Sequence, residues 1–425
     1  FKDRTNIIRN SDNSYSLCYA GHQFGNWAGQ LGDGRATTFG EIETFSGNLI
    51  DIQVKGGGLT PYSRFADGKA VLRSSIREFL ASEAMMALGI RTTRALAVLE
   101  SGESVKRDKV YNGNVKNEPG ALCIRTAPSF IRFGNFEMMK AQNQELLETL
   151  FDFEIKRNFQ ETLQKIIDES TEEMVKKIDL SSLDRFQNSI LSNFISQNRK
   201  EIYKKTLIKI SELTAEMVVG WESVGFVHGV MNTDNMSVLG LTIDYGPYGF
   251  MDFFDRKYTP NLSDHPGRRY SYQNQSGICV WNLSKLLSCF VGSIGNPEDL
   301  MNILQKGFLD TFDRLKREKF FNKLGLEQGD LKADLQFLDG LMELLNLLEL
   351  DFTRFFVCLE EGFDYELTDD LQYADGNFLV KFSKYIMIRC FDFREKNIEL
   401  DKDLENLQNQ KKNYKHGLSI EEIVL

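Results

Sequence analysis

The chain has 425 residues, of which 42% are hydrophobic, so it is long enough for two or three domains or subdomains with buried cores. Its 61 acidic residues outnumber its 51 basic ones and give a net charge of −10. This charge argues against nucleic acid as a partner, because non-specific nucleic-acid binding depends on basic groups. No stretch approaches the roughly 20 apolar residues of a membrane span, and the six cysteines form no CxxC pair that would indicate structural zinc.

The first third of the chain predicts a β-rich unit. Residues 16–136 are rich in glycine and contain short runs typical of strands. Residues 40–56 predict two strands joined by a turn at 46–48, with the second strand ending at Lys55. A further strand pair is expected within 93–128.

One helix interrupts these strands. Residues 67–88 carry apolar side chains at helical intervals, including Ile76, Leu80 and Ala84, and Gly89 ends the pattern. We therefore expect a helix over 67–88.

The remainder of the chain is predominantly helical in pattern. We expect a β-rich N-lobe at 1–136, a helical insertion at 137–210, a C-lobe at 211–310 and a helical C-terminal extension at 311–425. This order predicts an α+β chain with a protein-kinase-like bilobal fold.

The segment HGVMNTDNMSVLGLTIDYG at 228–246 resembles the catalytic and metal-binding loops of a kinase. Asn235 follows His228 at the kinase spacing, and Asp244 begins a D-Y-G triplet in place of D-F-G. Val230, however, occupies the position of the catalytic aspartate, and it can neither orient nor deprotonate a hydroxyl group. Asp234 is either a carboxylate supplied from another backbone position or a turn residue that caps its own loop.

Lys55 is the candidate for the kinase strand lysine, and it needs a carboxylate partner on the following helix. Glu78 lies 23 residues further on, and Glu83 is the competitor. The two glutamates are about 140° apart around a helix, so they do not share a face. We predict that Glu78 makes the ion pair.

Other residues are suited to holding a nucleotide. The segment GQLGDGRATTFGEI at 29–42 combines glycines, which allow backbone N–H groups to approach phosphate, with Arg35. Arg125 and Arg132 become relevant if they face the same ligand as Lys55. Asn235 and Asp244 offer the hard oxygen ligands that suit Mg²⁺.

Three segments together resemble the selenoprotein O family: YAGHQFGNWAGQLGDGRA, ADGKAVLRSSIREFLASEAM and FVHGVMNTDNMSVLGLTIDYGP. The resemblance covers roughly residues 15–285. It implies a kinase-like protein that binds ATP in reversed orientation and transfers AMP to Ser, Thr or Tyr hydroxyls of proteins. It also implies Mg²⁺, or Mn²⁺ in its place, as the metal.

The resemblance assigns roles residue by residue. Asp234 falls on the proton acceptor, and Asn235 and Asp244 fall on the metal ligands. The implied nucleotide contacts are Gly32, Gly34, Arg35, Lys55, Asp67, Gly68, Arg125, Arg132 and Asp244. The chain departs from the family at GGGL (56–59), in the 137–210 region, and in lacking a cysteine or selenocysteine near Leu425, which puts a C-terminal redox role in doubt.

Two alternatives to AMP transfer remain at this point: an ordinary phosphotransferase and a non-catalytic ATP-binding scaffold. The chain starts at Phe1, so any targeting segment is expected outside the printed sequence. Likeness to eukaryotic members indicates mitochondria, whereas a bacterial chain would be cytoplasmic.

Overall fold

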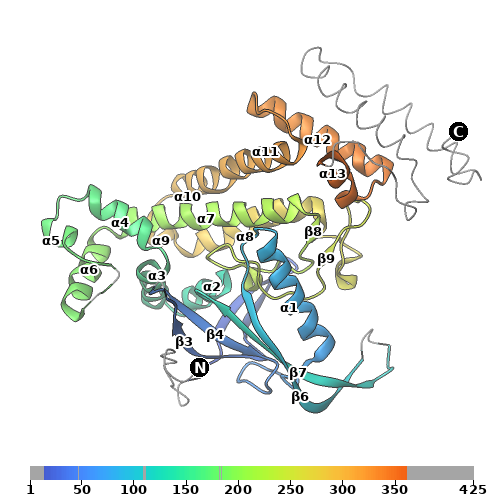
Figure 1. The fold of residues 1–425 in the computed structure, drawn as a ribbon. Helices are drawn as coiled ribbons and strands as arrows, with labels where there is room; N and C mark the ends of the chain where they lie inside the picture. The colour runs from blue at the N-terminus through green and yellow to red at the C-terminus, as the bar shows by residue number, and fades with distance from the viewer. Residues whose placement is uncertain (1–13, 46, 109–111, 181, 183, 361–425) are drawn as a thin grey trace, which may run out of the picture.

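The computed structural model describes residues 14–360 except 46, 109–111, 181 and 183. A β-sheet with one long helix against it lies on one side of the molecule, and a larger assembly of helices lies on the other (Figure 1). This α+β arrangement agrees with the expected bilobal fold. The part of the expected C-terminal extension beyond residue 360 lies outside the described residues.

Two β-structures form the first lobe. The strands β1 (Cys18–Gln23) and β2 (Asn26–Gly32) make an antiparallel hairpin. A five-stranded sheet has the order β3–β4–β7–β5, with β6 also paired to β7. Its strands are β3 (Ala36–Glu43), β4 (Leu49–Lys55), β5 (Ala70–Val71), β6 (Arg94–Arg107) and β7 (Lys116–Ala127). The predicted strand pairs within 40–56 and 93–128 are confirmed.

The helix expected at 67–88 is shorter than predicted. It is α1 (Leu72–Ala87), because Gly68 adopts a positive φ of 69° and Ala70 pairs with Ala121 of β7. The apolar residues of this pattern do not all lie on the buried face of α1. Ile76 and Leu80 are 43% and 61% exposed. The residues that α1 buries are instead mostly small or polar: Ser75, Glu78, Ala81, Ser82 and Met85.

The helical lobe is arranged around α7 (Arg199–Ser223), which runs through its middle (Figure 1). The helices before α7 are α2 (Phe133–Gln142), α3 (Gln144–Asn158), α4 (Gln160–Glu169), α5 (Glu173–Lys176) and α6 (Arg185–Gln197). The helices after it are α8 (Gln275–Cys289), α9 (Val291–Ile294), α10 (Pro297–Ile303), α11 (Asp310–Leu324), α12 (Leu331–Leu348) and α13 (Phe352–Glu360), with a π-helical segment η4 (Leu304–Leu309) between α10 and α11.

The domain boundaries expected from the sequence do not coincide with the loops between helices. The boundary at 136 falls inside α2, the one at 210 falls inside α7, and the one at 310 falls at the start of α11. The division into an insertion, a C-lobe and an extension therefore stays a prediction.

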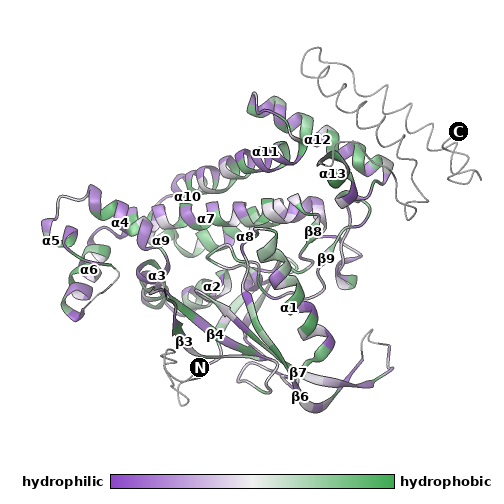
Figure 2. Cartoon of the chain, viewed as in Figure 1, coloured by the Kyte–Doolittle hydropathy of each residue, from purple (hydrophilic) through white to green (hydrophobic). Residues whose placement is uncertain are grey.

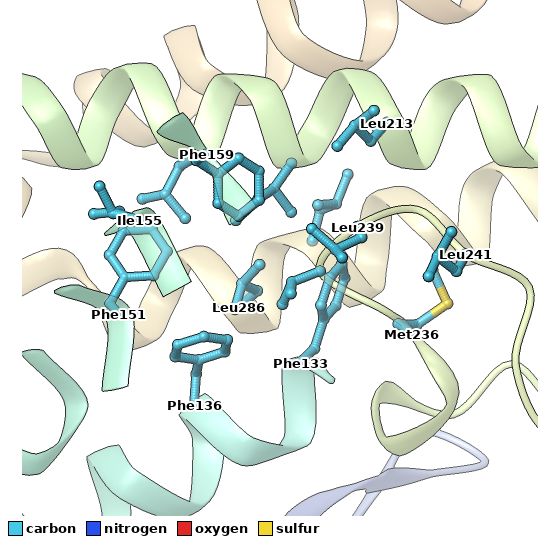
Figure 3. Packing of buried hydrophobic residues seen from close by; sticks show 14 of the residues in the cluster. Phe133, Phe136, Phe151, Ile155, Phe159, Leu213, Met236, Leu239, Leu241 and Leu286 are labelled. Carbon is cyan, nitrogen blue, oxygen red and sulfur yellow. The ribbon is translucent and has the colours of Figure 1, made fainter. Parts of the chain in front are cut away.

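The main core lies beneath α7. Phe133 and Phe136 from α2, Phe151 and Ile155 from α3, and Leu286 from α8 converge there (Figure 3). Several helices, α12 among them, alternate hydrophilic and hydrophobic residues along their length, as expected of helices with one buried face (Figure 2). None of the helices in the described part of the chain is long and apolar enough to span a bilayer.

The loop that resembles a kinase catalytic loop begins at a short strand pair. β8 (Phe226–Val227) pairs with β9 (Gly249–Phe250), and the segment between them contains the 3₁₀ turn η1 (Thr233–Asn235). His228 is buried, and its Nε2 lies 2.8 Å from the carbonyl oxygen of Ile243. Burial lowers the pKa of His228, so its imidazole is neutral. Through Ile243, this side chain connects the start of the loop to the residue before Asp244.

Candidate active site

Two adjacent strands deliver two cations to one face of the sheet. Lys55 ends β4, and Arg125 on β7 is the register partner of Gln53, two residues earlier on β4. Since alternate residues of a strand share a face, Gln53 and Lys55 point the same way. The oxygen Oε1 of Gln53 accepts a bond of 3.1 Å from Nε of Arg125 and orients the guanidinium.

The predicted ion pair is present. Nζ of Lys55 lies 2.9 Å from Oε2 of Glu78 on α1. Nη1 of Arg125 also donates to Oε1 of Glu78, at 3.0 Å. Glu83 faces elsewhere and pairs with Arg94.

Three cationic side chains donate hydrogen bonds to the carboxylate of Asp244. Its Oδ1 accepts from Nζ of Lys55 at 2.7 Å and from Nη1 of Arg125 at 2.6 Å, while its Oδ2 accepts from Nη1 of Arg132 at 2.6 Å. Burial alone would raise the pKa of the Asp244 carboxyl, but the charges of Arg132, Lys55 and Arg125 hold it well below its ordinary value. Asp244 also has a positive φ of 58°, an uncommon conformation that is found at functional sites.

Arg132 connects three segments of the site. Besides Asp244, its guanidinium donates to Oδ1 of Asp33 at 3.1 Å and to the backbone oxygen of Asp234 at 2.9 Å. Arg132 precedes α2 and is fully buried. One side chain therefore fixes the turn after β2, the η1 turn and the D-Y-G segment relative to one another.

Asp234 lies in η1 and is 7% exposed. Its Oδ2 accepts a bond of 3.2 Å from Nε2 of Gln23, whereas its Oδ1 is buried without a hydrogen-bond partner. Burial raises the pKa of Asp234 to about 6, and Arg132 and Gln23 oppose this rise. A carboxylate with a pKa in this range is suited to general-base chemistry near neutral pH.

An open pocket of about 770 Å³ adjoins these groups. Val230, in the position of the kinase aspartate, lines it. Most of the predicted site residues also line it: Gly34, Arg35, Lys55, Asp67, Gly68, Arg125, Asn235 and Asp244. Gly32, Arg132 and Asp234 are not among its lining residues, although Arg132 contacts Asp244.

Some predicted nucleotide contacts also have roles in the fold. Asp67 accepts two bonds from Arg107, and this hydrogen bonding lowers the pKa of Asp67 to about 2. A Cβ atom at Gly68 would lie 2.0 Å from the oxygen of Gly58, and the ring of Tyr62 covers Gly32. Arg35, by contrast, is exposed at the pocket and has no ion pair with any residue in the described ranges.

Several residues that line the pocket or support it were not predicted from the sequence. Asp33 is 3% exposed, and it pairs with Arg132 and accepts from Nε2 of Gln53 at 3.1 Å. Tyr19 stacks under Arg132, with 4.8 Å from Cζ to the ring centroid, and Phe65 presents a fully exposed ring at the pocket. Asp33 stands inside the glycine-rich motif GQLGDGR, which is the signal that could have found it.

A family model described as "Protein adenylyltransferase SelO" matches residues 5–422. The chain is 47% identical over 348 residues to a protein nucleotidyltransferase YdiU of Azoarcus sp., covering 82% of this chain and 60% of that protein. It is 45% identical over 343 residues to the protein of that name from Flavobacterium johnsoniae (80% of this chain, 59% of that protein) and 44% identical over 355 residues to that from Rhodopirellula baltica (83% and 60%). The chain thus spans about 60% of the length of these curated relatives.

Proposed function

Because this chain belongs to the SelO family of protein adenylyltransferases, we propose that it transfers AMP from ATP to Ser, Thr or Tyr hydroxyls of proteins and releases pyrophosphate. The observation that carries the proposal is the convergence of Lys55, Arg125 and Arg132 on Asp244 at the pocket wall. Three buried cations on one carboxylate form a site for a polyphosphate, whose oxygens would receive the same donors.

The residues at the pocket favour this reaction over phosphate transfer by a kinase mechanism. Val230 lines the pocket where a kinase aspartate would accept the proton. Asp234 is the nearby carboxylate whose pKa, raised to about 6 by burial, suits that task. The kinase aspartate is absent and Asp234 is present, which agrees with a changed reaction rather than with a loss of activity.

In the proposed reaction the acceptor hydroxyl attacks the α-phosphorus of ATP. A bond forms between the hydroxyl oxygen and the α-phosphorus, and the bond from that phosphorus to the oxygen bridging to the β-phosphorus breaks. The hydroxyl proton passes to Asp234, and the electron pair of the broken bond leaves with pyrophosphate. Lys55, Arg125, Arg132 and the exposed Arg35 would stabilise the charge of that leaving group.

We propose Mg²⁺, with Mn²⁺ as the alternative, as the metal. Asp244 supplies a carboxylate at the pocket, and Nδ2 of Asn235 donates to the oxygen of Val230 at 3.0 Å, which leaves the amide oxygen of Asn235 as the available ligand. Within the described ranges no group of three or more His, Cys, Asp and Glu side chains could hold a metal ion. The two side chains fit Mg²⁺, which is commonly bound by few protein oxygens together with substrate phosphates. The ion would neutralise charge on the departing pyrophosphate.

The test uses ATP labelled on either the α- or the γ-phosphate. The full chain is incubated with each nucleotide, Mg²⁺ and a mixture of proteins, and covalent label is measured after denaturation. We expect label only from α-labelled ATP and a mass increase equal to one AMP group. Label only from γ-labelled ATP would identify a phosphotransferase, and no label from either would identify a non-catalytic scaffold.

A further inference from the structure

The β1–β2 hairpin turns tightly beside the candidate base. Gln23 pairs with Asn26, so the turn consists of Phe24 and Gly25 alone. Both have positive φ, 49° and 85°, as a two-residue type I′ turn requires. A turn of this kind fixes the register of the hairpin and therefore the direction in which Gln23 points.

Backbone bonds anchor this hairpin to the catalytic turn on both sides of Gln23. The N–H of His22 donates to Oγ1 of Thr233 at 2.8 Å. The N–H of Phe24 donates to Oη of Tyr270 at 2.9 Å and to Oδ1 of Asn232 at 3.2 Å. The residue between these two anchored N–H groups has little freedom to move relative to η1.

The hairpin also packs directly on Asp234. A Cβ atom at Gly21 would lie 3.0 Å from Oδ1 of Asp234 and 3.0 Å from Oγ1 of Thr233, so only glycine fits there without displacement. Nε2 of Gln23 bonds Oδ2 of Asp234 at 3.2 Å. Among the described residues it is the only side-chain donor to this carboxylate, since Arg132 reaches the backbone oxygen of Asp234.

We infer that Gln23 is a positioning residue: its amide holds the Asp234 carboxylate in the orientation that receives the acceptor's proton. The inference rests on the proposed function and adds a specific residue to it. Oδ2 retains a second lone pair while it accepts from Gln23, so the hydrogen bond fixes the carboxylate without preventing the acceptor hydroxyl from binding. Without the amide, the carboxylate would rotate about its side-chain bonds and lose its alignment with the hydroxyl.

The experiment measures transfer of α-labelled AMP to protein by the full chain carrying Gln23→Leu, a change that keeps most of the side-chain volume and removes the donor. We expect kcat to fall roughly ten- to hundredfold, as for loss of a hydrogen bond to a charged group, while KM for ATP changes less than about twofold. Gln142→Leu is the matched control, because Gln142 is exposed at the end of α2 and does not line the pocket. It should leave kcat unchanged.

A double-mutant cycle separates positioning from a structural role. If Gln23 acts through Asp234, then Gln23→Leu should have no further effect in an Asp234→Asn background. The same fold-decrease in both backgrounds, a parallel loss of ATP affinity, or unchanged kcat would overturn the inference. Failure of the proposed function is distinguishable, because the unsubstituted chain would then transfer no α-label.

Discussion

Replacing Asp244 by asparagine removes one negative charge from a buried cluster in which charges balance. Lys55, Arg125 and Arg132 are matched there by Asp244, Glu78 and Asp33. Asparagine keeps the shape of the side chain but leaves one buried positive charge without a counter-charge. Removing one partner of a buried pair costs about 3–5 kcal/mol, which is a large part of a typical stability of about 5–15 kcal/mol.

The loss of stability can be measured by urea denaturation in buffer with a metal chelator, followed through the fluorescence of the three tryptophans. The midpoint for Asp244→Asn should fall well below that of the unsubstituted chain. Glu83→Gln is the control on the same structural unit, because it breaks the partly exposed pair with Arg94 and should cost less than about 1 kcal/mol.

Pyrophosphate provides the second arm of this test. In Asp244→Asn the donors that Lys55, Arg125 and Arg132 give to the carboxylate become available to an anion, and one positive charge lacks a counter-charge, so pyrophosphate without metal should bind at least roughly tenfold more tightly than to the unsubstituted chain. At a hundred times its Kd it should restore about 2.7 kcal/mol of stability. If Asp244→Asn unfolded at the same urea midpoint as Glu83→Gln, and bound pyrophosphate no more tightly than the unsubstituted chain, the idea that the three cations around Asp244 form a polyphosphate site would be refuted.

Three further predictions concern single side chains. Asp234→Asn should lower AMP transfer about 10²–10⁴-fold and leave ATP affinity nearly unchanged, as measured by label transfer and by nucleotide titration; a loss below tenfold would exclude Asp234 as the base. Lys55→Met should weaken ATP binding or turnover more than Glu78→Gln does, and Glu83→Gln should match the unsubstituted chain in the same assays. A damaging Glu83→Gln together with a silent Glu78→Gln would contradict a functional role for the Lys55–Glu78 ion pair of 2.9 Å. Glu154 is fully buried, and burial raises its pKa from 4.5 to about 7, so the stability that its protonated form contributes is complete below pH 4.5 and is lost as pH rises through 7. Relative to Glu154→Gln, the unsubstituted chain should lose up to about 3 kcal/mol between pH 4.5 and pH 8 in urea midpoints, and a pH-independent difference would exclude the raised pKa.

The ion pair of the site could be predicted from the sequence because local periodicity determines it. A lysine at a strand end and a helix beginning soon afterwards leave few choices of partner, and the angle between Glu78 and Glu83 means that only one of them can face the lysine. Asp244 could be found for a similar reason, since it follows an apolar run at a fixed spacing from His228.

The rest of the site depends on contacts between distant segments. Gln23 and Asp234 are 211 residues apart, and no local pattern connects them. The buried role of Asp33 depends on Arg132, which arrives from another part of the chain. The buried face of α1 could not be predicted from hydrophobicity, because the apolar Ile76 is exposed whereas the polar Ser75 and Glu78 are buried.

The buried polar contacts of α1 have a consequence for how this protein can be controlled. Kinases are commonly switched by swinging the corresponding helix outward, which separates its glutamate from the strand lysine. Here Glu78 bonds Arg125 as well as Lys55, and Ser82 donates to the backbone oxygen of Thr93. An outward swing of α1 would remove the Glu78 carboxylate that Lys55 and Arg125 share and leave one buried positive charge without a counter-charge, at a cost of several kcal/mol. The position of α1 is therefore costly to change, and we expect any on–off control of this chain to act on other elements.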